Sequence, residues 1–169
     1  ANTNAVQYHF GNRDALVQAI FAWRVWQMEP VRQAMLAEAD ERGLGDDLHA
    51  LLRILCEPML ELTDAEGRHT YAAFMSKYLL QQRPAGIMHA AENRPELSRI
   101  LRQVMVRLSR LISAAEEMSD YRIALAYMVV TNVLVICDNE GVSRNDPGQL
   151  RERFELALAM AAAALERGR

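Results

Sequence analysis

Apolar residues along this chain recur at the spacing of α-helices. Leu16, Ile20 and Trp23, for example, follow one another at intervals of four and three residues, which places them on one helix face. Nowhere does an alternation of apolar and polar residues last for more than a few positions, as a half-buried strand requires. The pattern therefore predicts an all-α fold.

Glycine, proline and capping residues divide the chain into seven predicted helices. They span residues 2–10, 12–42, 47–62, 69–82, 95–112, 119–138 and 149–166. The third helix is capped by Asp46 or Asp47 and the sixth by Ser119 or Asp120. We expect bends at Pro30 and Pro58, breaks at residues 64–67 and 83–86, a loop or short turn at 87–94, and a plain loop at 141–148.

The last two predicted helices carry more apolar surface than one chain needs. Residues 119–138 show one stripe at Ile123, Tyr127, Val130 and Leu134 and another at Leu125, Val129, Val133 and Ile136. We expect two copies of the chain to pair as a four-helix bundle and form a homodimer. The expected interface consists of Ile123, Tyr127, Val130, Leu134, Phe154, Leu158, Ala161 and Leu165. The alternative is a helical hairpin buried within a monomer.

The first predicted helix has one polar and one apolar side. Thr3, Asn4, Gln7 and Tyr8 share one side, and Val6 and Phe10 lie opposite. Short amide, hydroxyl and phenol groups are suited to contact base edges and phosphates in a major groove. Gly11 can end this helix and Asn12 can cap the next one, while Arg13 places a cation in a first turn, where a phosphate would be a suitable partner. The alternative is an ordinary surface helix.

Residues 5–16, AVQYHFGNRDAL, resemble the end of the helix-turn-helix and the start of the fourth helix in the tetracycline-repressor (TetR) family of transcriptional regulators. The resemblance implies an all-α, two-fold symmetric repressor with an N-terminal DNA-binding unit and a larger domain that binds a small effector and dimerises. It covers about the first thirty residues. It implies the C-terminal part of a helix-turn-helix domain at residues 1–28, a ligand-binding and dimerisation domain at 29–169, and two further helices before Ala1.

Carried over position by position, the resemblance implies seven DNA-binding residues. Thr3, Asn4 and Gln7 would face bases and Ala5 a thymine methyl group, while Tyr8, His9 and Arg13 would hold phosphates. An aromatic residue commonly stands where this chain has Gln7. Either Tyr8 alone makes the phosphate contact or Gln7 reads a base.

Aromatic and methionine side chains in the middle of the chain predict an effector pocket. Its expected lining is Met59, Tyr71, Phe74, Tyr78, Met105, Leu108 and Tyr127. Flexible thioethers, aromatic surfaces and a few phenols suit a small, mostly apolar molecule held by one or two hydrogen bonds. The simpler alternative is that these residues only fill the core.

Composition narrows the expected cellular location of the protein and the classes of partner it could bind. Hydrophobic residues make up 51% of the 169 positions and charged residues 24%, as in ordinary globular proteins. The formal charge of −3 does not favour nucleic acid, but Arg13, Arg24 and Arg32 outnumber Asp14 and Glu29 near the N-terminus. Two cysteines, Cys56 and Cys137, predict a reduced cytoplasmic location. The apolar stretch 123–137 falls short of the ~20 residues that span a bilayer, so we expect no membrane contact.

Motifs for catalysis or metal binding are missing from the sequence. His9, His49, His69 and His89 have no metal-site spacing, and the Glu66/His69 pair lacks the second copy that a di-iron site needs. Phosphate loops, dinucleotide glycines and nucleophile elbows are also missing. We therefore expect no cofactor, no metal and no enzymatic activity. The favoured function is a DNA-binding repressor that an apolar effector releases from its operator; the alternatives are a helical-bundle enzyme and a helical interaction module without a ligand.

Overall fold

The computed structural model describes residues 10–81, 98–112 and 116–166. Its elements are α2 (Arg13–Glu41), α3 (Leu48–Cys56), the 3-10 helix η1 (Glu57–Glu61), α4 (Thr70–Gln81), α6 (Arg99–Ile112), α7 (Glu116–Asn139), α8 (Val142–Asn145) and α9 (Pro147–Glu166). Helices, turns and loops account for all the described residues, and no strand occurs among them. The all-α expectation is confirmed.

Helix α2 has the length and the caps that the sequence predicts. The side chain of Asn12 accepts a hydrogen bond from the Ala15 amide at 2.8 Å, which satisfies one of the free donors of the first turn. After the helix, Gly43 adopts a φ of +72°, a conformation that glycine adopts without steric cost. Pro30 lies within α2 without interrupting it.

Asp47, rather than Asp46, caps α3. Its carboxylate accepts a hydrogen bond from the Ala50 amide at 2.8 Å. The helix changes to the tighter η1 next to Pro58, which has no backbone N–H for the α-helical hydrogen-bond pattern. The expected bend at Pro58 is thus a change of helix type. The break at residues 64–67 is confirmed and precedes α4. The breaks and turns expected between residues 83 and 95 lie outside the described residues.

The region between the last two helices differs from the expected plain loop. Residues 142–145 form the short helix α8, and α9 begins at Pro147, two residues before its expected start. Asp146 accepts a hydrogen bond from the Gln149 amide at 2.9 Å, and proline suits the first position of a helix because its missing N–H would be unpaired there anyway. Helix α7 begins at Glu116, three residues before the expected Ser119.

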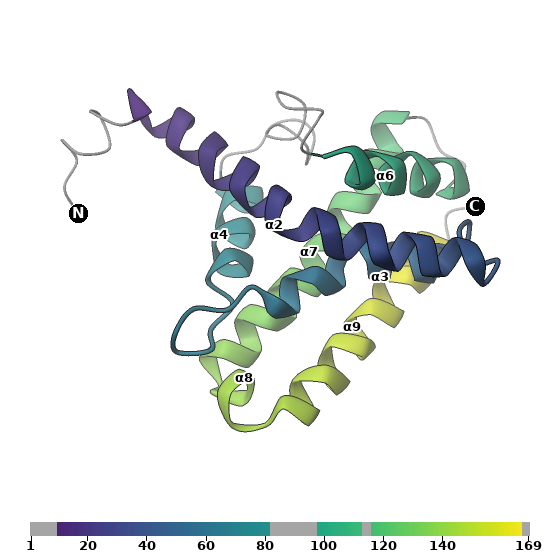
Figure 1. The fold of residues 1–169 in the computed structure, drawn as a ribbon. Coiled ribbons are helices and arrows are strands. Elements are labelled where there is room, and N and C mark those ends of the chain that lie inside the picture. Colours follow the sequence, from purple (N-terminus) through teal and green to yellow (C-terminus); the bar gives the residue numbers. More distant parts are fainter. Residues whose placement is uncertain (1–9, 82–97, 113–115, 167–169) are drawn as a thin grey trace.

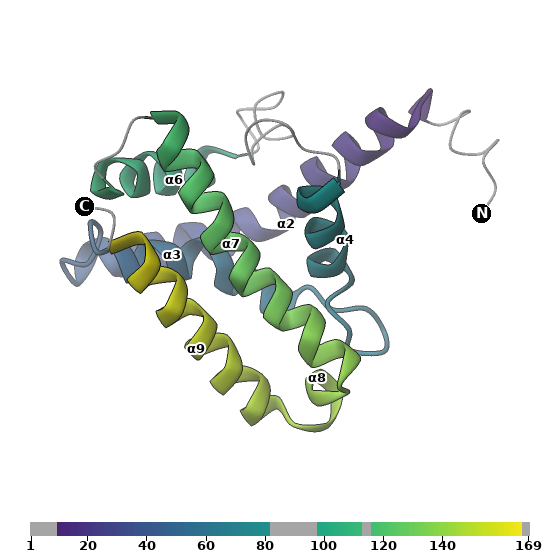
Figure 2. The same cartoon turned by 180° about the vertical axis from the view of Figure 1, so that it is seen from behind.

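The helices pack around one hydrophobic core. Helices α7 and α9 lie side by side in an antiparallel hairpin, and α4 packs along α7 (Figure 2). Helix α3 contacts α2, α6, α7 and α9 and therefore occupies the middle of the body. The N-terminal end of α2 projects from the other helices (Figure 1). This long helix therefore extends from the core of the protein to its N-terminal segment.

The expected dimer interface needs correction. All eight of its residues are buried within a single chain: Ile123, Tyr127, Val130, Leu134, Phe154, Leu158, Ala161 and Leu165. They hold the hairpin to the core and leave no surface for a second copy. The other stripe of α7 provides exposed apolar side chains at Leu125, Val129 and Ile136.

One helix among the described residues, Met118–Asn139, is long and apolar enough to cross a membrane by length and composition. It has 22 residues, so the expectation that this stretch is too short is wrong, because residues flanking 123–137 continue the same helix. Burial of one full stripe against other helices is also what a core helix of a bundle shows. Its composition is therefore weak evidence for a membrane span.

Candidate ligand-binding site

Most of the expected DNA-binding residues lie outside the described part of the chain. These are Thr3, Asn4, Ala5, Gln7, Tyr8 and His9. Arg13 is the first residue of α2, and its side chain is not among those described. The assignment of these residues to DNA contacts stays a prediction.

Three of the expected pocket residues form an aromatic row on α4. The ring of Phe74 stacks at a centroid distance of 6.2 Å from Tyr71 and 6.3 Å from Tyr78. Phe21 of α2 closes the row, with its ring 4.8 Å from Tyr78 in an edge-on arrangement and 5.4 Å from Phe74. Sequence reasoning missed Phe21. The row joins α2 directly to α4.

A second group of the expected residues meets deeper in the core. The Tyr127 hydroxyl of α7 donates a hydrogen bond to the Met59 sulfur of η1 at 2.8 Å. Met105 and Leu108 also lie in the core, on the buried face of α6, which packs on α2, α3 and α7. All seven residues therefore belong to one hydrophobic cluster, but direct contacts are shown only for the α4 row and for the Met59–Tyr127 pair.

Arg32 of α2 is the unexpected residue in this core. Only 1% of it is exposed, although arginine is almost never fully buried without a partner. It follows Val25 and Met28 and precedes Leu36 and Ala39 on the buried stripe of α2. This spacing of three and four residues is visible in the sequence and marks Arg32 as a cation on an apolar face. Sequence reasoning counted it only as a charge near the N-terminus.

The hydrogen bonds of Arg32 leave most of its guanidinium unsatisfied. Its Nη2 lies 3.3 Å from the Leu55 carbonyl oxygen and 3.5 Å from the Met28 sulfur, while Nε and Nη1 have no acceptor within the described ranges. Among the described residues it forms no ion pair. An incompletely paired buried charge is costly, because burial removes the water that would solvate it.

The groups that surround Arg32 share its dry environment. Burial lowers the pKa of Arg32, with nearby Tyr127, Tyr71, Glu29 and Cys56 opposing that shift. Burial also raises the pKa of the Cys56 thiol to about 12 and raises the pKa values of the Tyr71 and Tyr127 phenols. At neutral pH the phenols therefore keep their protons and can donate hydrogen bonds, and the thiol is a poor nucleophile.

Glu29 lies three residues before Arg32 on α2, and its carboxylate interacts electrostatically with Arg32. Its Oε1 accepts a hydrogen bond from the Ile100 amide at 2.5 Å, at the start of α6, and its Oε2 has no partner. Glu29 and Arg32 interact electrostatically without forming an ion pair. The charge of Arg32 is therefore only partly balanced within the described part of the protein.

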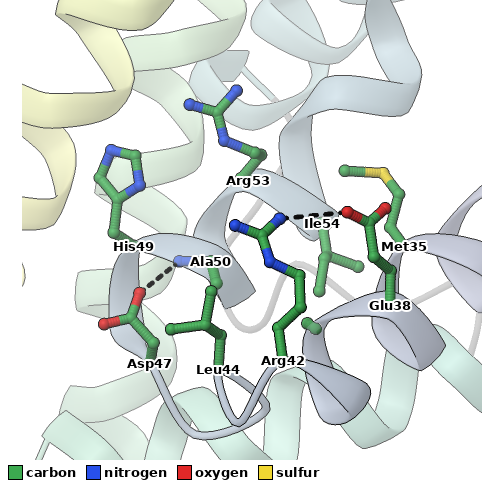
Figure 3. A pocket seen from close by; sticks show the side chains of 10 residues that line it. Met35, Glu38, Arg42, Leu44, Asp47, His49, Ala50, Arg53 and Ile54 are labelled. Carbon is green, nitrogen blue, oxygen red and sulfur yellow. Dashed lines mark hydrogen bonds and ion pairs between the residues drawn. The ribbon is translucent and has the colours of Figure 1, made fainter.

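A separate surface pocket of about 250 Å³ lies between the end of α2 and α3 (Figure 3). Its charged groups are already engaged. Arg42 pairs with Glu38 at 3.1 Å, Asp47 caps α3, and Arg53 pairs with Glu57 and Glu155. Because these groups satisfy one another, the pocket offers less to a ligand than Arg32 does.

The histidine and glutamate considered as metal ligands have other roles. His69 is buried and its Nδ1 lies 2.8 Å from Asp138 Oδ1, while Glu66 contacts Arg68. In the described ranges, no three His, Cys, Asp or Glu side chains come together as a metal site would require.

The core around Arg32 thus combines a cation with free donors, two protonated phenols and a border of aromatic and thioether groups. Such a combination is suited to binding a small molecule. Comparisons of the chain with protein-family models, with curated proteins and with solved structures find no match.

Proposed function

We propose that this protein is a DNA-binding transcriptional regulator of the TetR type, and that a small, mostly apolar effector in its helical core releases it from DNA. The observation that carries the proposal is the course of α2. One unbroken helix begins directly after the segment that resembles a DNA-reading helix, and it brings Phe21, Met28 and Arg32 into the core. A ligand in the core would thus contact the helix that holds the DNA-binding segment.

The proposed mechanism is a shift between two orientations of α2. Two reading helices of a dimer must lie about 34–36 Å apart to enter successive major grooves on one face of DNA. A ligand that binds more tightly to an orientation with a different spacing would lower the affinity for DNA. The contacts of Phe21 with Phe74 and Tyr78 support this proposal. They connect α2 to α4, and α4 carries residues of the expected ligand pocket.

The proposal includes a homodimer, now formed through the outer face of the α7–α9 hairpin. This face carries seven exposed apolar residues, named here the hairpin patch: Met118, Tyr121, Leu125, Val129, Ile136, Leu156 and Met160. Taken as roughly half of about 180 Å² each, their side chains expose on the order of 600 Å², at the upper end for a monomer surface and approaching the ~800 Å² that one partner buries in a typical complex. An uncharged apolar patch is complementary to a copy of itself, so a second copy of the chain is the proposed occupant.

DNA binding by the protein tests the proposed function. Tyr8→Phe and Arg13→Ala should weaken binding to all sequences and flatten its salt dependence, because each removes a phosphate contact. Gln7→Ala should change sequence preference by about 1–3 kcal/mol for the lost base contact. Fluorescence anisotropy with labelled duplexes measures both effects.

The exposed Lys77, far along the chain on α4, provides the matched control, and Lys77→Ala should leave binding unchanged. Operator affinity that is unaltered in a variant with Tyr8, Arg13 and Gln7 all replaced would rule out the proposed DNA-binding surface.

A further inference from the structure

We propose that the effector is a carboxylic acid with an apolar body, and that Arg32 binds its carboxylate. This inference rests on the ligand-binding core of the proposed function and specifies the chemical class of the ligand. It starts from the fact that Arg32 is buried, charged and incompletely hydrogen-bonded.

The hydrogen-bonding capacity of Arg32 indicates an acceptor that the described residues do not supply. A guanidinium carries five N–H donors, and here only those on Nη2 have acceptors, at 3.3 Å from the Leu55 oxygen and 3.5 Å from the Met28 sulfur. The three donors on Nε and Nη1 have no acceptor in the part of the chain that the structure describes. Buried polar groups are nearly always hydrogen-bonded, so donors left free in this way indicate a ligand with acceptor oxygens.

The charge balance indicates that this ligand is an anion with a single negative charge. Arg32 forms no ion pair with any described residue, and Glu29 uses one carboxylate oxygen to accept from the Ile100 amide. A carboxylate supplies one negative charge and two acceptor oxygens in a plane, which suits a guanidinium. A phosphate dianion would bring more charge than one arginine balances in a dry core.

The groups around Arg32 indicate an apolar body behind the carboxylate. Met28 contacts the guanidinium, and Met59 contacts Tyr127, whose phenol interacts electrostatically with Arg32. Unbranched, flexible thioethers therefore lie among the groups near Arg32. Such side chains can change rotamer to make room for a ligand. The protonated phenol of Tyr71 lies in the electrostatic surroundings of Arg32 and is a neutral donor suited to a carboxylate oxygen. The Tyr127 hydroxyl lies in the same surroundings and donates to the Met59 sulfur.

Binding at Arg32 would act on α2 directly, because the residue belongs to that helix. It lies 19 positions after Arg13, or about 28 Å along the helix at the usual rise of 1.5 Å per residue. A small rotation of α2 about this point would therefore move its N-terminal end by a larger distance.

Isothermal titration calorimetry on this chain tests the chemical class. The probes are octanoate, decanoate and 3-phenylpropionate, each compared with its primary amide, which has a similar shape and no charge. We expect at least one acid to bind and its amide to bind at least about 30-fold more weakly, since the amide cannot supply the counter-charge. An acid and its amide with equal affinities, or no binding by any of the acids, would overturn the proposal.

Variants of Arg32 separate a ligand-binding role from a structural one. Arg32→Met should weaken acid binding by about 30-fold or more, and should raise the melting temperature of the ligand-free chain, because it removes an unbalanced buried charge. If Arg32 only stabilised the fold, Arg32→Met would lower the melting temperature and leave the preference for acid over amide intact. Arg42→Met is the control at the C-cap of the same helix, where the side chain is exposed, and should change neither quantity.

Glu29 offers a further discriminating variant. Its negative charge near Arg32 competes with a bound carboxylate, so Glu29→Gln should strengthen acid binding several-fold. Weaker acid binding in Glu29→Gln would contradict the proposed charge balance. This measurement and the acid–amide comparison on the unaltered chain remain decisive if Arg32→Met does not fold.

These binding measurements contain no DNA, so a failure of the ligand assignment can be distinguished from a failure of the proposed function. If the protein binds acids through Arg32 but does not bind DNA, the proposed role as a transcriptional regulator is contradicted and the proposed ligand class is not. A DNA-binding protein that binds only neutral apolar compounds would contradict the ligand assignment alone.

Discussion

Gly45 lies where the end of α2 meets α6, and a Cβ atom there would come within 1.9 Å of Asp40 Oδ1 and 2.7 Å of Arg107 Nη1. The missing side chain lets Arg107 donate to both Asp40 oxygens and, at 3.0 Å, to the Gly45 carbonyl oxygen. The pairing with Arg107 also lowers the pKa of Asp40. A single glycine thus permits a polar contact between two helices.

Gly45→Ala should destabilise the protein at neutral pH, because Asp40 must move away from the new methyl group and lose its contact with Arg107. The lowered pKa of Asp40 sets the pH dependence. The stabilisation is fully present above the unfolded pKa, near 4, and is lost as pH falls through the folded pKa. Urea unfolding should therefore show a lower midpoint for the variant at pH 7 and a difference that shrinks toward pH 2.

Gly148→Ala is the matched control, since the nearest atom to its Cβ would be Asp146 Oδ1 at 3.4 Å, an ordinary contact distance. Its effect should not depend on pH in this range. A deficit of Gly45→Ala that is the same at pH 7 and pH 2 would show that the Asp40–Arg107 pair is not the cause.

At the scale of elements, Asp138 joins three helices at one corner of the molecule. It lies near the end of α7, and its Oδ2 accepts from the His69 backbone amide at 2.7 Å, directly before α4. Its Oδ1 accepts from the Ser143 hydroxyl of α8 at 2.6 Å and lies 2.8 Å from His69 Nδ1. A carboxylate at the start of α4 also interacts favourably with the positive end of the helix dipole.

Asp138→Ala should destabilise the protein by about 2–3 kcal/mol, because it leaves the buried His69 and its amide without an acceptor. Asp138→Asn should cost less, since the amide side chain keeps an acceptor oxygen. Unfolding monitored by circular dichroism in urea measures both free energies.

Glu140→Ala is the comparison two residues away, where an exposed carboxylate pairs with Arg153. Such surface pairs contribute about 0–1 kcal/mol. Equal losses in Asp138→Ala and Glu140→Ala would mean that the contacts of Asp138 add nothing beyond an ordinary surface pair.

At the scale of the whole molecule, the hairpin patch is an apolar surface that remains exposed in a single chain. Its members on α7 are spaced by three, four or seven residues, so they share one helix face, and the exposed Leu156 and Met160 lie on α9, which packs against α7. Figure 2 shows the two helices side by side on this face of the molecule. The expected consequence is an association of two chains through this face.

Leu125→Glu combined with Leu156→Glu should convert the dimer into a monomer, because burying two carboxylates in each half of an apolar interface is unfavourable. Light scattering after size exclusion should give twice the chain mass of 19.1 kDa for the unaltered protein and the single mass for the variant. Leu80→Glu, on the exposed side of α4, should leave the dimer intact. A monomer already present in the unaltered protein at micromolar concentration would refute the proposed dimer.

Local sequence signals predicted the helices well because they act within a few residues. The caps at Asn12 and Asp47, the glycine after α2 and the apolar spacing each depend on neighbouring positions. Helix α8 was missed because a single helical turn has too few residues to show a periodicity.

The candidate site was predictable only in part. Tyr71, Phe74 and Tyr127 were expected around a ligand, and they do lie in the core. Arg32 was not expected there, although its place on the apolar stripe of α2 is a signal. An arginine at such a position can also extend to the surface, so the stripe alone does not decide its burial.

By itself, the sequence determined that the chain is helical, where most of its described helices begin and end, and which residues are apolar enough for a core. Only the tertiary structure decided which stripe of α7 faces inward and that Arg32 has no ion-pair partner among the described residues. The physical reason is that both outcomes depend on distant segments: α7 has apolar side chains on opposite faces, and the packing of α3, α4 and α9 selects the face with Ile123 and Leu134. Periodicity describes a helix alone, whereas burial and ion pairing depend on the helices that pack around it.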